Sequence, residues 1–307
     1  MLKNKITLHD KELFEKYTYA QNMEASGLSF TSLFMWKDLN KFTYEIINDF
    51  LCICGINYLE MDYLEHFALP PLSIKDYNPT KLSETLDILR EKFKNRNCEF
   101  KIKLVPEELI ESFQMSKPNE LDFISDRDNA DYVYLSKNLI ELKGRKYHSK
   151  KNHLNFFYKN IPFEYVSLTP DLIKDCISLT KQLVENRTYT VLEKTLIELE
   201  EQAVEQALNN MDALGCKGGA ILINGQVEAF TLGCKVNPNM FVVHIEKANT
   251  KIRGLYPAIN QQFSKDACAD MEYINREEDM GLENLRKSKL SYRPDKMIEK
   301  YDVIFKK

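Results

Sequence analysis

Two short segments carry residue types suited to acid–base chemistry on a polar substrate. The first, "HIEKA", ends an apolar run and contains His244, Glu246 and Lys247. The second, "INREED", follows another apolar run and supplies an amide, a guanidinium and two carboxylates: Asn275, Arg276, Glu277 and Asp279. Carboxylates and imidazoles can accept a proton from a nucleophile, and a guanidinium can stabilise an oxyanion. The candidate catalytic residues are therefore Glu246, Asp279, Arg276 and His244.

The charged stretch continues beyond the second segment. Gly281 permits a turn, and the helix expected next places Arg286 and Lys289, which are three residues apart, on one face pointing back at Glu246 and Asp279. A solvated loop is the alternative, because charge runs usually face water. The candidate substrate-binding residues are Asn275, Glu277, Lys247, Arg286, Lys289 and Tyr292.

Alternation along a strand would set the direction of the first segment's side chains. In "MFVVHIEKA" a strict period of two places His244 and Glu246 on one face, opposite Val243 and Ile245. A carboxylate in the middle of a central strand needs a partner, since burying an unpaired charge is costly. We expect that partner to be Lys247, Arg276 or Arg286, whereas His244 fits a core histidine as well as a catalytic one.

The elements around these segments are clearest in the second half. Helical periodicity covers "DLIKDCISLTKQLVENR" and "LEKTLIELEEQAVEQALNNM", and three strands follow: "KGGAILI", "QVEAFTLGCKV" and "MFVVHIEKA". Asn224-Gly225 is a favoured hairpin turn between the first two strands. The helix "YPAINQQFSKDAC", the strand "MEYIN", the helix "LENLRKSKL" and the strand "MIEKYDVIF" complete the half. The resulting order is α-α-β-β-β-α-β-α-β.

The first half repeats this order, from the helix "HDKELFEKYTYA" to a closing strand, "DYVYLS". At 307 residues the chain also favours two domains. The sequence thus predicts a duplicated α+β architecture with domains at 1–140 and 161–307, joined by a basic connecting helix at 141–160. On that helix Lys143, Lys146 and Lys150 share a face, and its candidate polyanion-binding residues are Arg145, Lys146, His148, Lys150 and Lys151. A solvated connector whose lysines pair with carboxylates is the alternative.

Composition limits the possible functions. A hydrophobic fraction of 44% is ample for two cores, and a net charge of −4 argues against a surface that coats nucleic acid throughout. The seven cysteines are scattered without a CxxC pair, so neither a disulfide framework nor a zinc site is indicated. The sequence shows no membrane-spanning run and no signal-peptide core, so we expect a cytoplasmic protein.

Three motifs resemble one known family. They are "LKGRKYHSKKNHLNFF", "HIEKANTKIRGLYPAINQQF" and "INREEDMGLENLRKSKLSYRPDKMIEKY". Together they resemble the DUF2156 family, which is similar to the C-terminal domain of phosphatidylglycerol lysyltransferase and related to the Fem-type aminoacyltransferases. The resemblance implies two tandem GNAT-like domains, each a mixed, mostly antiparallel sheet flanked by helices. It also implies that two neighbouring strands splay apart at the ends of "HIEKA" and "INREED".

The resemblance implies aminoacyl transfer from aminoacyl-tRNA to an amine or hydroxyl on a lipid head group, peptide or small molecule. Glu246 or Asp279 would hold or deprotonate an amino group, and Arg276 or Lys289 would stabilise the oxyanion or a terminal phosphate. The connecting helix would contact the tRNA backbone. No cofactor, metal or covalent nucleophile would be required. The amino acid, the acceptor and the oligomeric state stay open.

Two other functions remain possible. GNAT enzymes bind the pyrophosphate of acyl-CoA with a Q/R-x-x-G-x-G/A loop, and the corresponding candidate phosphate-binding residues here are Lys251, Arg253 and Gly254. Tyr256 replaces the small last residue of that loop, which disfavours acetyl-CoA as the donor. A non-catalytic binding module is the third possibility.

Overall fold

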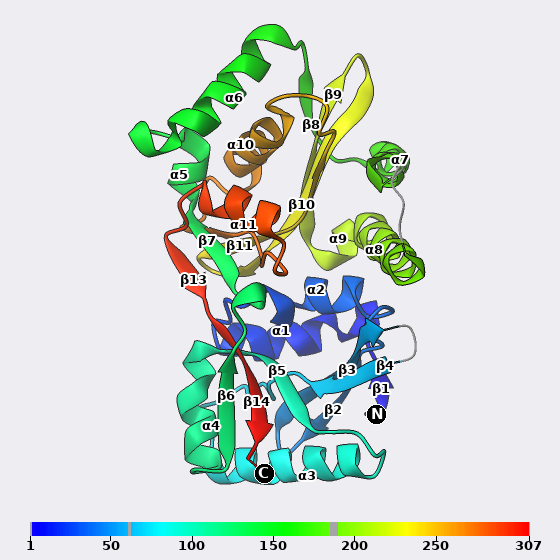
Figure 1. Ribbon diagram of the computed structural model, residues 1–307, viewed down its shortest axis with the longest axis vertical. Helices are drawn as coiled ribbons and strands as arrows, with labels where there is room; N and C mark the ends of the chain where they lie inside the picture. Colours follow the sequence, from blue (N-terminus) through cyan, green and yellow to red (C-terminus); the bar gives the residue numbers. More distant parts are fainter. Residues whose placement is uncertain (1, 61–62, 185–189, 307) are drawn as a thin grey trace. The chain divides into compact units, whose positions relative to one another are not determined.

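The computed structural model describes residues 2–60, 63–184 and 190–306, and the chain divides into two compact units (Figure 1). Unit 1 comprises Met1–Ala130 and Ile298–Lys307, and unit 2 comprises Asp131–Met297. The boundaries differ from the expected domains at 1–140 and 161–307. The reason is an exchange of strands between the two halves of the chain.

Unit 1 contains a seven-stranded sheet in the order β1-β2-β3-β4-β5-β14-β6. The strands are β1 (Asn4–Lys5), β2 (Thr43–Ile47), β3 (Phe50–Glu60), β4 (Tyr63–Ala68), β5 (Lys101–Pro106), β6 (Leu121–Ser125) and β14 (Lys300–Phe305). The helices are α1 (Lys11–Ala20), α2 (Phe30–Met35), α3 (Pro79–Lys94) and α4 (Ile110–Ser116). Asn48 and Asp49, with φ of 51° and 72°, make the two-residue turn between β2 and β3.

Unit 2 repeats this arrangement with the sheet order β13-β7-β12-β11-β10-β9-β8. The strands are β7 (Asp131–Leu135), β8 (Glu164–Ser167), β9 (Cys216–Ile223), β10 (Gln226–Asn237), β11 (Met240–Ala248), β12 (Tyr273–Asn275) and β13 (Lys296–Ile298). The helices are α5 (Ser136–Glu141), α6 (His148–Asn160), α7 (Ile173–Val184), α8 (Val191–Asn209), α9 (Met211–Leu214), α10 (Leu255–Ala267) and α11 (Glu283–Leu290). Helix α10 packs on β9, β10 and β11 with α5 and α6 beside it, whereas α7 also contacts β10 and β11 and packs against α8 (Figure 1).

The duplicated order predicted from sequence is present, and the two sheets have equivalent pairings. In each sheet one parallel pair, β4·β5 or β11·β12, is followed by an antiparallel strand. That next strand comes from the other half of the chain. Strand β7, expected to close the first sheet, lies beside β12, and β14, expected to close the second, lies between β5 and β6. The α+β class with two mixed sheets is thus confirmed.

The connecting segment differs from the expected continuous helix. Gly144 has φ of 97°, a short 3-10 turn covers Arg145–Tyr147, and α6 begins at His148. Lys143 therefore precedes the helix. Tyr147, Leu154 and Phe157 are buried in the core that α10 shares with the sheet. Helix α6 is consequently part of unit 2 and holds a fixed position beside α10.

Candidate functional site

Strands β11 and β12 diverge where the sequence places its candidate residues. Their parallel pairing covers Met240↔Tyr273 to Val242↔Asn275 and then ends, although β11 continues to Ala248. The chain after β12 stays with β7 instead: Arg276 N donates to Tyr132 O over 2.9 Å, and Tyr132 N donates to Glu277 O over 3.1 Å. Side chains from the two diverging segments meet across the opening.

A β-bulge in β11 changes the direction of those side chains. Pairing with β10 passes from Leu232↔Ile245 to Gly233↔Val243, so His244 is the extra residue. The expected alternation is therefore wrong after Val243. Phe241, Val243 and Ala248 belong to the core under α10. Glu246 accepts a hydrogen bond from Asn260 Nδ2 on α10 over 2.9 Å, which places it on the α10 side.

His244 and Glu246 consequently belong to two different clusters on opposite faces of the sheet. The two consecutive residues Arg276 and Glu277, which follow β12, also point to opposite faces. Arg276 donates from Nη2 to Glu246 Oε1 over 2.7 Å, whereas Glu277 Oε1 lies 2.8 Å from His244 Nδ1. Lys247 pairs with Glu200 of α8 and is thus directed away from α10.

The first cluster centres on Arg276. Its side chain and that of Glu246 are 11% and 12% exposed, so the ion pair is largely desolvated. Burial lowers the pKa of Arg276, but Glu246 outweighs this effect and raises it. The guanidinium carbon lies 4.8 Å from the centre of the Tyr292 ring and 5.8 Å from that of Tyr134. Among the described residues, Arg276 Nη1 is buried without a hydrogen-bond partner.

Lys150 enters this cluster from α6. Its Nζ lies 4.3 Å from the centre of the Tyr292 ring. Burial and the nearby Arg276 lower the pKa of Lys150 to about 8, although Glu246 partly offsets them. Burial also raises the pKa of Tyr292, so its hydroxyl stays protonated. Two cationic side chains thus lie over the same phenol ring, and one of them, Arg276, is paired with Glu246.

The second cluster was only partly predicted. His244 Nε2 lies 3.2 Å from Cys234 Sγ of β10, and its Nδ1 faces Glu277. Although burial lowers the pKa of His244, Cys234 and Glu277 together raise it to about 10. Nothing in the sequence distinguishes Cys234 among the seven scattered cysteines, because its contact with His244 depends on the bulge.

The charged segment from residue 276 to 289 is ordered by its own contacts. Asp279 is buried and accepts from Arg286 Nε at 2.9 Å, Arg286 Nη2 at 2.8 Å and Tyr132 Oη at 2.5 Å. Burial raises the pKa of Asp279, but these donors outweigh it and lower the pKa to about 2. Lys289 Nζ donates to the carbonyls of Arg276 and Glu278. Arg286 thus contacts Asp279 as expected, whereas Lys289, expected to point at Glu246 and Asp279, contacts backbone oxygens instead.

The buried amide of Asn275 anchors the start of that segment. Its Nδ2 donates to Asp131 Oδ2 over 3.0 Å, and its Oδ1 accepts from Glu277 N over 2.7 Å. Glu277 itself has φ of 57°, in the left-handed region that non-glycine residues rarely adopt. Strained backbone of this kind is concentrated at functional sites.

The candidate phosphate loop lies at the start of α10. Gly254 has φ of 87°, and a Cβ there would lie 2.3 Å from His153 O of α6. Arg253 Nε donates to His153 Nδ1 over 3.5 Å, and its guanidinium lies 4.6 Å from the centre of the Phe156 ring. Lys251 and Tyr256 are exposed. The glycine therefore permits close packing of α6 on this loop.

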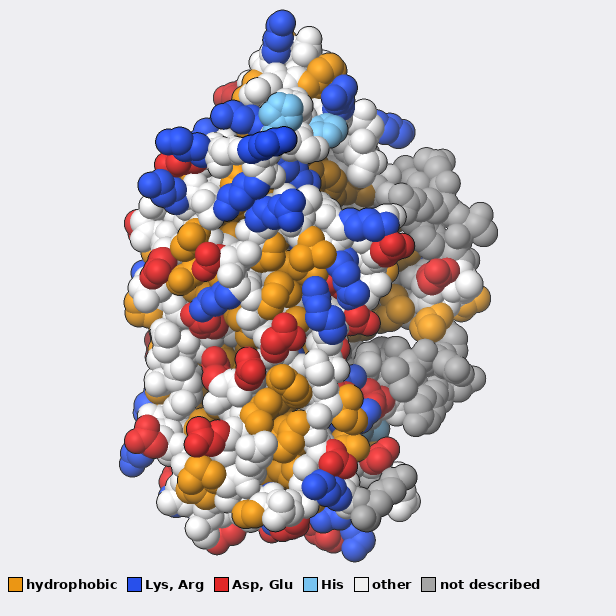
Figure 2. All heavy atoms as spheres, turned by 60° about the vertical axis from the view of Figure 1, so that its left-hand side comes forward, with side chains coloured by type: hydrophobic (Ala, Val, Ile, Leu, Met, Phe, Trp, Pro, Cys, Tyr) orange, Lys and Arg blue, Asp and Glu red, His pale blue; other side chains and the backbone are white. Residues whose placement is uncertain are grey.

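Exposed cations gather over the start of α6. Figure 2 shows Lys and Arg side chains concentrated at that end of unit 2. Arg145, Lys146, His148 and Lys151 are exposed, whereas Lys150 is half-buried. The five candidate polyanion-binding residues of the sequence thus have two parts: a surface group of four and one lysine, Lys150, in the Arg276 cluster.

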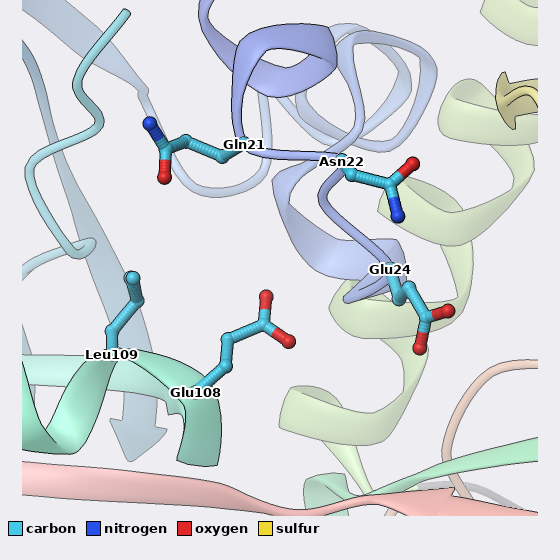
Figure 3. Close-up of a pocket in the computed structure, with 5 residues that line it drawn as sticks. All are labelled: Gln21, Asn22, Glu24, Glu108 and Leu109. Carbon is cyan, nitrogen blue, oxygen red and sulfur yellow. The ribbon is translucent and has the colours of Figure 1, made fainter. Parts of the chain in front are cut away.

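A hollow in unit 1 contains none of the candidate residues. It measures about 380 Å³ and is lined by Gln21, Asn22, Glu24, Glu108 and Leu109 (Figure 3). The residues that the structure describes contain no His, Cys, Asp or Glu group arranged to hold a metal. Within the same ranges, no helix has the length and apolar character needed to cross a bilayer.

Comparison with known proteins identifies relatives. The family described as "Phosphatidylglycerol lysyltransferase, C-terminal" matches residues 20–304. A conserved protein of unknown function from Bacteroides thetaiotaomicron is 33% identical, with a TM-score of 0.87 and full coverage of both chains. An uncharacterized protein of Mycoplasmoides gallisepticum is 26% identical over 57% of this chain, and the match spans only 56% of that relative's length.

Two more distant structures share the fold. The DUF2156 domain from Agrobacterium fabrum has a TM-score of 0.60 and 11% identity, covering 97% of this chain and 92% of its own. FemX has a TM-score of 0.62 and 9% identity, covering 98% and 97% respectively. The expected similarity to lysyltransferase C-terminal domains and Fem-type proteins is confirmed.

Proposed function

Because the chain belongs to the phosphatidylglycerol lysyltransferase C-terminal family, we propose that it transfers an aminoacyl group from aminoacyl-tRNA. The acceptor is an amine or hydroxyl of a lipid head group, peptide or small molecule. The observation that carries the proposal is the buried Arg276–Glu246 pair, whose guanidinium retains a donor without a partner among the described residues. A desolvated donor of this kind suits an oxyanion that develops in the transition state.

The chemistry needs a proton acceptor as well as an oxyanion donor. The acceptor's amine or hydroxyl attacks the ester carbonyl, loses a proton, and displaces the ribose hydroxyl, which gains one. Lys150 is the proposed base, because its pKa of about 8 makes the neutral amine accessible near neutral pH. Glu246 holds Arg276 in place, and Arg276 Nη1 is the proposed oxyanion donor. Asp279 is less suited to accept a proton, since Arg286 and Tyr132 already bind its carboxylate.

The exposed cations near the start of α6 support a polyanionic donor. Arg145, Lys146 and Lys151 lie on the same short segment as Lys150. A tRNA backbone bound to these cations would lie next to the Lys150 side of the cluster, which suits delivery of an esterified 3′ end. Neutralising phosphates in this way supplies affinity without sequence readout.

Acyl-CoA-dependent transfer is the alternative. The left-handed Gly254 at the N-terminus of α10 favours it, because helix N-termini bind phosphates. The close approach of His153 O to Gly254 disfavours acyl-CoA binding. The backbone of α6 already occupies the space beside the glycine that a phosphate would need. Aminoacyl transfer would need no bound cofactor, whereas the alternative would use acetyl-CoA or another acyl-CoA.

The test uses purified protein and total tRNA charged with labelled amino acids. Label should move to vesicles containing phosphatidylglycerol, or to free lysine as a water-soluble amine, faster than in buffer alone. Calorimetric titration with acetyl-CoA supplies the other arm. Binding of acetyl-CoA together with stable aminoacyl-tRNA would overturn the proposal in favour of the alternative. Binding of tRNA with no transfer to either acceptor would favour a non-catalytic module.

A further inference from the structure

Three adjacent strands of unit 2 and the segment after β12 bring together four side chains that the proposed reaction does not use. Cys216 at the start of β9 is the direct cross-strand partner of Cys234 on β10. Cys234 in turn contacts His244 of the β11 bulge, and His244 contacts Glu277. Strands β9, β10 and β11 lie side by side in Figure 1. The four side chains therefore form a row: the thiols of Cys216 and Cys234, the imidazole of His244 and the carboxylate of Glu277.

The contacts around Cys234 favour its thiolate. Cys234 Sγ lies 3.2 Å from His244 Nε2, and Glu277 Oε1 lies 2.8 Å from His244 Nδ1. A carboxylate on one ring nitrogen stabilises the imidazolium, and an imidazolium beside a thiol favours the nucleophilic thiolate. The bulge at His244 and the left-handed backbone of Glu277 bring these groups together.

Cys216 is positioned to resolve an oxidised Cys234. Directly opposed residues of an antiparallel pair have Cα atoms about 4.5–5.5 Å apart, which lies within the range for a disulfide. Their side chains also project from the same face of the sheet. Gly215, with φ of 72°, immediately precedes Cys216 and gives that strand end freedom to adjust.

We propose that Cys234 and Cys216 form a reversible redox pair, in which Cys234 reacts with a small hydroperoxide and Cys216 completes a cross-strand disulfide. The Cys234 thiolate attacks the O–O bond. It is oxidised by two electrons to a sulfenic acid, while the hydroperoxide is reduced and leaves, with a proton, as an alcohol or water. Cys216 then attacks the sulfenic sulfur, and hydroxide leaves with the Cys216 proton as water. A dithiol reductant then restores both cysteine thiols by thiol–disulfide exchange and is itself oxidised to a disulfide.

Burial determines which oxidants reach the pair. Cys234 and Cys216 are 5% and 7% exposed, so a molecule the size of hydrogen peroxide is a suitable reagent and a bulky one is not. The disulfide would remove Cys234 Sγ from His244, directly beside the strand opening. The inference concerns thiol chemistry and does not depend on aminoacyl transfer.

The test treats the full reduced chain with one equivalent of hydrogen peroxide, then blocks remaining thiols with N-ethylmaleimide in denaturant. Intact mass should show five blocked thiols of the seven, and peptide mapping should identify a Cys216–Cys234 link. In Cys216→Ser, dimedone should trap the sulfenic acid at Cys234. The buried Cys52 and Cys54 are internal controls that should stay reduced, because burial raises the pKa of both thiols.

Variants separate activation from simple proximity. His244→Gln should slow disulfide formation at least tenfold relative to the parent. Glu277→Gln should slow it by a smaller factor, and this variant keeps the proposal testable if His244→Gln folds poorly. Circular dichroism checks the fold of each. Three results would each overturn the proposal. They are seven blocked thiols after treatment, an oxidation rate in both variants equal to that of the parent, and oxidation of another cysteine before Cys234.

Discussion

Arg276 and Glu246, thirty residues apart in sequence, join the two diverging strands through a 2.7 Å hydrogen bond. The pair is nearly buried, so removing either charge leaves the other desolvated, which typically costs about 3–5 kcal/mol. An Arg276→Ala variant would therefore lose activity both by removing the oxyanion donor and by destabilising the fold, and the two effects could not be separated. A substitution that keeps the positive charge is the better probe.

Arg276→Lys should lower kcat/KM for aminoacyl transfer about 100-fold, because lysine keeps a charge for Glu246 but lacks the second guanidinium nitrogen. Steady-state kinetics and thermal melts measure the two effects separately. Arg90→Lys, at an exposed position of unit 1, is the matched control and should change neither. A full-rate Arg276→Lys enzyme would exclude Arg276 as the oxyanion donor.

The rate of transfer should rise with pH through about 8. Burial and Arg276 lower the pKa of Lys150 to about 8, so its proportion of neutral, proton-accepting amine grows across that range. Lys150→Met should lower kcat at least 100-fold and remove this rise. Lys151→Met, its exposed neighbour, should keep the shape of the profile. The same rise in the Lys150→Met profile would assign it to the substrate's own amine.

Replacing Arg145, Lys146 and Lys151 by Ala should weaken tRNA binding and reduce the slope of log Kd against log salt by about 2–3, since three fewer phosphates are neutralised. Fluorescence anisotropy over a salt series measures that slope. A triple Ala variant at the exposed Lys5, Lys16 and Lys94 of unit 1 should retain the parent slope. Equal slopes in both variants would mean that the start of α6 does not contact tRNA.

Asp279→Asn should lower the free energy of unfolding by about 2 kcal/mol at neutral pH, because the folded-state pKa of Asp279 is about 2 against an ordinary value of 3.8. The depressed pKa means that this stabilisation is complete above pH about 4 and is lost as the pH falls towards 2. Urea titrations at pH 7 and pH 2.5 measure it. The difference between parent and variant should shrink at the lower pH. A constant difference would show that Asp279 stabilises the segment independently of its charge.

The sequence predicted most elements because hydrophobic period and turn residues are local properties. Asn224-Gly225, for example, predicts the β9–β10 turn regardless of which sheet the hairpin joins. The strands β1, β6 and β8 were not predicted. The assignment of β7 and β14 to particular sheets depends on pairings between distant segments, which periodicity does not encode.

Prediction of the site was limited in the same way. The sequence correctly brought Glu246 together with Arg276, since both leave neighbouring strands at one end. It wrongly placed His244 on the same face as Glu246. The bulge at His244, which the alternation of "MFVVHIEKA" does not reveal, puts the two side chains on opposite faces of the sheet. It also grouped Lys150 with surface lysines, although a half-buried position on α6 distinguishes it.

Because β14 is the last strand of the chain, the sheet of unit 1 cannot be completed until translation is almost finished. Strand β14 lies between β5 and β6, yet it is translated after the whole of unit 2, which takes on the order of ten seconds at typical rates of chain elongation. Throughout that interval β6 has no strand to pair with in its own sheet, and β5 presents an open edge. A nascent chain stalled before residue 298 should therefore bind chaperones, and a released fragment ending there should aggregate, because unpaired strand edges recruit other chains.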